Sequence, residues 1–198
     1  MPLLNKKLNA TAILIANSIL ERAVVCATKI EEIFWAESPR SAKFTDEHFQ
    51  DIVTEFVHTL IYLSYQDAHA MIREPKVRDA FIDGVASYVT ELGCNQPMSA
   101  KHPVPPFTRK IEPQITVKGF GIERLTERCA EYSRFTLFAA ENKPLLSGTV
   151  GWEFGKHIVQ ICDRYHHDER IQSLARDFLM DMYKDMTPLL CKIAEFRT

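Results

Sequence analysis

The chain has 198 residues, of which 46% are hydrophobic and 25% charged. This length and composition predict one globular domain, residues 1–198, with a core large enough to fold without a metal ion or a disulfide. The net charge of −2 argues against a nucleic-acid-binding protein, which normally carries a basic surface.

The first predicted helix covers residues 6–35. Its apolar residues recur at spacings of three and four, which is the helical repeat. They are Leu8, Ala12, Ile15, Ile19, Ala23, Cys26, Ile30 and Ile33. A second apolar row, from Ile13 to Ala27, lies beside the first. Such a wide apolar surface predicts a helix that is central in the fold, at a subunit interface, or both.

The same segment raises the question of a targeting signal, because Lys6 and Lys7 precede an apolar run. Glu21 and Arg22 end that run, and no small-residue cleavage site follows it. We therefore expect neither a signal peptide nor a membrane span.

Two further helices are predicted in the N-terminal half, at residues 45–72 and 75–92. Thr45 is a suitable N-cap, and Pro75 suits the first turn of a helix. The stretch 94–118 holds five of the ten prolines and cannot form a regular helix. We expect it to connect two three-helix halves, either as a functional loop or as a strap over the surface.

The C-terminal half contains predicted helices at residues 122–141, 149–166 and 169–195, the last kinked or split by Pro188. Gly151 and Gly155 lie one turn apart in the second of these. Glycine inside a helix costs about 1 kcal/mol relative to alanine. We expect a close helix–helix approach to offset this cost, with a ligand against that face as the alternative. The fold class is thus predicted to be an all-α bundle of about six helices.

A row of polar residues along the predicted helix 45–72 contains the leading candidate site. The row consists of Asp51, Glu55, His58, Tyr62, Tyr65 and His69. The spacing Glu55-x-x-His58 is the one by which di-iron helical bundles direct a carboxylate and an imidazole to one metal ion. Glu55 and His58 are therefore candidate ligands of a divalent metal, with Asp51 as a weaker one. A solvated flank of the helix is the alternative interpretation.

A metal site in a bundle needs a second helix with similar residues. The helix at 149–166 contains Asp163-x-x-His166 and Glu153-x-x-x-His157, which makes His157 and His166 weaker candidates. Lys156 and its polar neighbours instead suggest that His157 lies on a solvent-facing stripe. His166 is also explained by a helix C-terminus, where an imidazolium is favoured.

The cysteines and short motifs point to no other chemistry. The five cysteines include no C-x-x-C pair, so we expect small apolar fillers in a cytoplasmic protein. No G-x-S-x-G, Walker or dinucleotide-binding motif is present, and the catalytic and cofactor-binding residues stay unknown.

These observations favour a non-enzymatic helical binding protein that self-associates through its first helix, as a homodimer or another homo-oligomer. The first alternative is a metal-dependent enzyme, either di-iron-like or mononuclear, that uses Glu55 and His58. The second is a small-molecule sensor with a pocket between its helices.

Overall fold

The computed structural model describes residues 2–37, 44–95, 122–137, 147–162 and 169–192. Within them, 89% of residues are helical. The helices are α1 (Pro2–Glu37), α2 (Asp46–Met71), α3 (Pro75–Asn95), α4 (Ile122–Tyr132), α5 (Val150–Ile161) and α6 (Glu169–Leu190). The all-α prediction is confirmed, and the described ranges contain no strand beyond an isolated bridge between Thr136 and Thr149. The predicted proline-rich connection lies outside the described residues from position 96 onward.

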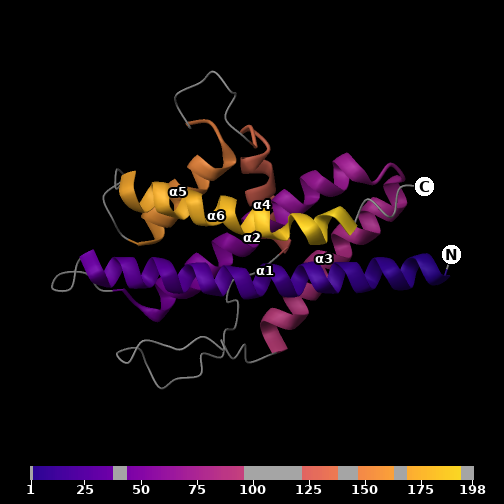
Figure 1. Cartoon of the computed structure of the whole chain (residues 1–198), viewed down its shortest axis with the longest axis horizontal. Coiled ribbons are helices and arrows are strands. Elements are labelled where there is room, and N and C mark those ends of the chain that lie inside the picture. The colour runs from indigo at the N-terminus through magenta and orange to yellow at the C-terminus, as the bar shows by residue number, and fades with distance from the viewer. Residues whose placement is uncertain (1, 38–43, 96–121, 138–146, 163–168, 193–198) are drawn as a thin grey trace.

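Helix α1 lies along the long axis of the molecule and packs against α2, α3 and α6 (Figure 1). Its first apolar row is buried from Leu8 to Ile30, and most of the second row is buried as well. The prediction of a central helix is therefore confirmed, and the neighbouring helices account for the width of its apolar surface. Leu14, at 46% exposed, is a large apolar side chain that they leave uncovered.

Helix α1 is also long and apolar enough to cross a membrane, judged by length and composition alone. Buried core helices and signal sequences pass the same test. Half of its most apolar window is buried against other parts of the chain, so core packing offers one explanation for its composition.

Helix α2 begins as predicted, because Thr45 caps it. The Thr45 hydroxyl accepts a hydrogen bond from the backbone N–H of His48, and His48 Nδ1 accepts one from the Thr45 N–H at 3.0 Å. This reciprocal pair satisfies backbone donors that a helix start leaves open. Every residue of α2 from 52 to 64 is buried, so the helix is surrounded on all sides along that stretch.

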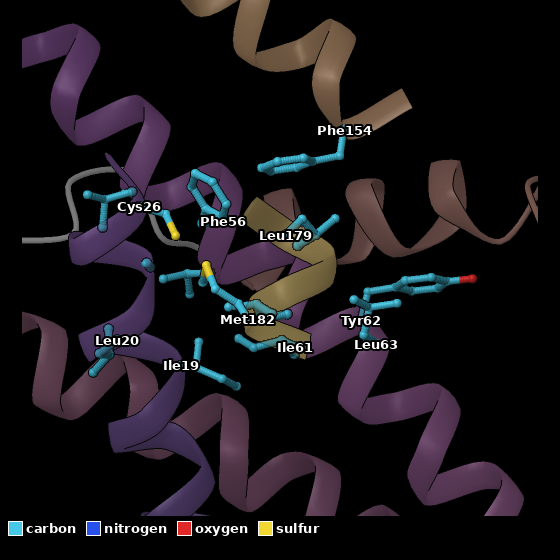
Figure 2. Packing of buried hydrophobic residues seen from close by; sticks show 14 of the residues in the cluster. Ile19, Leu20, Cys26, Phe56, Ile61, Tyr62, Leu63, Phe154, Leu179 and Met182 are labelled. Atoms are coloured by element: carbon cyan, nitrogen blue, oxygen red, sulfur yellow. The ribbon is translucent and has the colours of Figure 1, made fainter. Parts of the chain in front are cut away.

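The apolar core joins α1, α2, α5 and α6, as Figure 2 shows for ten labelled side chains. The rings of Phe56 and Phe154 meet edge to face with their centroids 4.6 Å apart. Leu179 and Met182 bring α6 to the same cluster. Each such side chain contributes about 1.5–3 kcal/mol when fully buried, so this cluster fixes how the four helices pack.

Helices α5 and α6 approach each other closely at Gly155. A Cβ atom there would lie 2.5 Å from the backbone oxygen of Gln172, nearer than real Cβ atoms come. The predicted close approach is confirmed at this position. At Gly151 the nearest atom is the flexible Cγ of Arg176 at 3.0 Å, and at Gly84 it is the Cβ of Ala12 at 3.4 Å.

Two predicted helix ends were wrong. Helix α4 ends at Tyr132 rather than near 141, because the backbone then turns and pairs with the start of α5. Thr136 N–H donates to the Gly148 carbonyl at 3.1 Å, and Val150 N–H donates to the Thr136 carbonyl at 2.9 Å. Helix α5 ends at Ile161 rather than near 166. Helix α6 is not split, since Pro188 lies in its last turn and the helix continues to Leu190.

Candidate functional site

Glu55 is the centre of a polar network that links α2, α4 and α5. Its side chain is fully buried. Its Oε1 atom accepts a hydrogen bond from the Tyr132 hydroxyl at 2.6 Å and lies 3.0 Å from Nδ1 of His157. Its Oε2 atom accepts one from Nε of Arg128 at 3.1 Å. Both carboxylate oxygens are therefore occupied by groups of the same chain.

His157 lies between two carboxylates. Its Nδ1 faces Glu55, and its Nε2 lies 3.0 Å from Oε1 of Glu131. Nδ1 also lies 3.0 Å from the Tyr132 hydroxyl, so the two ring nitrogens contact a tyrosine as well as both carboxylates. The side chain of His157 is 9% exposed. It therefore lies between the buried Glu55 and the surface of the protein.

Arg128 and Glu131 complete the network on α4. One guanidinium nitrogen of Arg128, Nη1, donates to Oε2 of Glu131 at 2.6 Å, while Nε binds Glu55. The two carboxylates are thus contacted by one guanidinium and one imidazole ring. Arg128 and Glu131 are 24% and 36% exposed, so the network extends from the core to the surface.

Tyr132 is buried at the inner end of α4. Its hydroxyl lies 3.2 Å from Oγ1 of Thr59, a residue of α2 that also donates to the Glu55 carbonyl at 2.9 Å. Burial raises the pKa of Tyr132 well above its ordinary value, and the negative charge of Glu55 adds to this effect. The hydroxyl therefore stays protonated and serves as a donor to Glu55.

The network keeps Glu55 ionised despite its burial. Burial alone would raise the pKa of this carboxyl, but the contacts with His157, the charge of Arg128 and the hydrogen bond from Tyr132 act against it and lower the pKa to about 2. Hydrogen bonds and opposite charges around an ionised group have this effect. Glu55 is therefore a paired, ionised carboxylate at neutral pH.

His58, one turn further along α2, is also fully buried. Burial lowers its pKa to about 4; the charge of Glu55 opposes this shift, while Arg124 and Arg128 add to it. His58 is therefore a neutral imidazole at pH 7. The alternative interpretation of the polar row as a solvated flank was wrong for Glu55, His58 and Tyr62, all of which are buried.

The candidate metal ligands fall into different surroundings. Glu55 and His157 meet, whereas Asp51 is half-buried at the edge of the same row. His166 lies outside the described residues. Within the described part of the chain, no group of three His, Cys, Asp or Glu side chains is arranged to hold a metal ion.

The sequence interpretation missed the contribution of α4. Arg128 and Glu131 were visible as an i,i+3 ion pair, but nothing local showed that α4 packs over Glu55. The solvent-facing interpretation was wrong for His157, which is buried, although its neighbours Lys156 and Glu153 do pair with each other near the surface at 2.7 Å. No family model, no curated protein and no solved structure matches the chain. The description of the Glu55 network therefore rests on its geometry alone.

Proposed function

We propose that this protein acts by binding another molecule and not by catalysis, and that the Glu55–His157 network maintains the shape of the bundle. The support for this is that the network satisfies itself: Arg128 and His157 each contact both carboxylates, and both oxygens of Glu55 are hydrogen-bonded. Catalytic groups need an accessible atom whose protonation or charge can change during a reaction. A self-satisfied network suits a structural role better.

The metal-dependent enzyme is the second candidate, because two of its predicted ligands, Glu55 and His157, lie within 3.0 Å of each other. Against it, Nδ1 of His157 faces Glu55 and Nε2 faces Glu131, so a metal ion would have to displace one of these carboxylates from the ring. Metal-binding histidines usually use one nitrogen for the metal and the other for a carboxylate or carbonyl.

Elemental analysis of the purified full-length protein separates the two candidates. We expect less than stoichiometric iron, manganese and zinc, and no rise in melting temperature when these ions are added in excess. Stoichiometric metal that is lost in both His58→Ala and His157→Ala would overturn the binding proposal in favour of the enzyme. Glu153→Gln on the outer side of α5 is the matched control and should leave the metal content unchanged.

Self-association through α1 stays a prediction, and α1 now supports it less, because its apolar rows are largely used inside the chain. Sedimentation at micromolar concentration tests it: a monomer would remove the homo-oligomer part of the proposal.

The sensor alternative has little support from the hollow between α2, α5 and α6, which is bounded by Leu63, Gly151 and Tyr183 and is too shallow to enclose a water molecule. The cytoplasmic location also stays a prediction.

A further inference from the structure

Helix α4 is attached to the bundle by fewer apolar contacts than its neighbours. Its main packing partner is α2, whereas α1 packs against α2, α3 and α6. Among the described side chains of α4, Leu125 and Tyr132 are buried and Cys129 is half-buried. Helix α5 is one residue longer. The apolar side chains that α5 buries are Val150, Phe154, Ile158 and Val159.

The ionic network provides the specific attachment of α4. Arg128 and Tyr132 donate to Glu55, and Glu131 accepts from His157. Buried ion pairs contribute little net stability, because desolvation opposes their attraction, but losing one partner leaves an uncompensated charge. These contacts therefore lock α4 onto α2, and the loss of any one of them weakens that attachment.

Helix α4 lies over the polar row of α2. Glu55 binds Tyr132, and the Tyr62 ring centroid is 5.7 Å from that of Tyr132. Helix α4 therefore covers the part of the row that contains Glu55 and Tyr62.

A helix of 11 residues does not persist alone in water, since isolated helices shorter than about 12–15 residues are marginal. If α4 leaves α2, it must also unfold. Such local unfolding of one weakly packed element, with the remaining core intact, is a common low-energy opening in proteins.

We propose that α4 is a displaceable cover over the polar row of α2, locked by the contacts of Arg128, Glu131 and Tyr132 with Glu55 and His157. Its release exposes Glu55 and Tyr62 while the other described helices stay packed. This inference concerns access to α2 and is independent of whether the chain acts by binding or by catalysis.

Hydrogen exchange of the full-length protein, followed by mass spectrometry, tests the cover. In the wild-type chain, the amides of residues 126–132 should exchange at least roughly tenfold faster than those of residues 15–27 and 52–64. Glu131→Gln and Tyr132→Phe should accelerate the hydrogen exchange of α4 further and leave the exchange of residues 15–27 unchanged. Glu153→Gln, which breaks the partly exposed ion pair with Lys156 within α5, is the matched control and should leave the exchange of α4 unchanged.

Thiol labelling provides a second readout. Cys129 lies on α4 against α2, and Cys26 is buried in the apolar core. In the variants Glu131→Gln and Tyr132→Phe, the thiol of Cys129 should be labelled faster than in wild type. The thiol of Cys26 should be labelled at the wild-type rate. The proposal is wrong if α4 exchanges at the same rate as α1 and α2 in wild type and in every variant, because α4 would then belong to one cooperative core. It is equally wrong if Cys26 and Cys129 gain reactivity together, since the variants would then loosen the whole bundle.

Discussion

The carboxylate of Glu55 and the imidazole of His157 lie 3.0 Å apart although 102 positions separate them in the chain. Helix α2 supplies the first and α5 the second, and the edge-to-face contact of Phe56 with Phe154 holds the two helices together beside them. Apolar packing thus brings the two polar groups together, and α4 encloses them from the other side.

Loss of the Glu55 charge should destabilise the protein strongly. Glu55→Gln removes the negative partner of Arg128 and His157, and breaking a buried ion pair in this way costs about 3–5 kcal/mol. Urea denaturation measures the change in the free energy of unfolding. The control Glu153→Gln breaks an ion pair nearer the surface and should change it by about 1 kcal/mol or less. Equal effects of the two substitutions would contradict the central role assigned to Glu55.

Stability should fall in two steps as the pH is lowered. Unfolded His58 takes up a proton near pH 6.5, but the folded residue does so only near pH 4. Between these values the unfolded state binds more protons, so the free energy of unfolding falls as the pH falls, by about 3 kcal/mol in all. A second loss follows below pH 4.5, where unfolded Glu55 becomes protonated while the folded carboxyl stays ionised down to about pH 2.

His58→Gln isolates the first of these steps. This substitution removes the titrating ring, so the free energy of unfolding should depend less on pH between 6.5 and 4 than in wild type, whatever its absolute value. Urea titrations at several pH values measure this slope. An unchanged slope in the variant would show that another group causes the loss.

Gly155 and Gly151 should respond oppositely to substitution by alanine. Gly155→Ala places a methyl group 2.5 Å from the backbone oxygen of Gln172, and such overpacking costs about 1–3 kcal/mol. Gly151→Ala meets the movable side chain of Arg176 and gains up to about 1 kcal/mol of helix propensity. Thermal melts of the two variants compare these effects, and a Gly155→Ala protein as stable as wild type would refute the close contact of α5 with α6.

The hydroxyl of Tyr183 should anchor α6 to α2. It lies 2.9 and 2.8 Å from the two carboxylate oxygens of Asp67. Because hydrogen bonds to charged groups contribute about 1.5–3 kcal/mol, Tyr183→Phe should destabilise the protein by about 1–2 kcal/mol. In a double-mutant cycle with Asp67→Asn, the two effects should not add. Additive effects would mean that the pair does not interact in solution.

Much of the fold followed from the sequence because helices depend on neighbouring residues. The three–four spacing of apolar residues predicted α1, α2 and α3 closely, and Thr45 predicted the start of α2. The glycine at position 155 indicated a close approach before its partner helix was known. The end of α4 could not be predicted in this way, since it depends on hydrogen bonds between Thr136 and the distant start of α5.

By itself, the sequence determined which segments are helical and which of their faces are apolar, since both are properties of residues within one or two turns of each other. Only the tertiary structure decided that the polar row of α2 is buried, that His157 points inward, and that Arg128 neutralises Glu55. These facts depend on contacts across 73 and 102 positions. Such contacts arise from the way whole helices pack, which local periodicity does not encode.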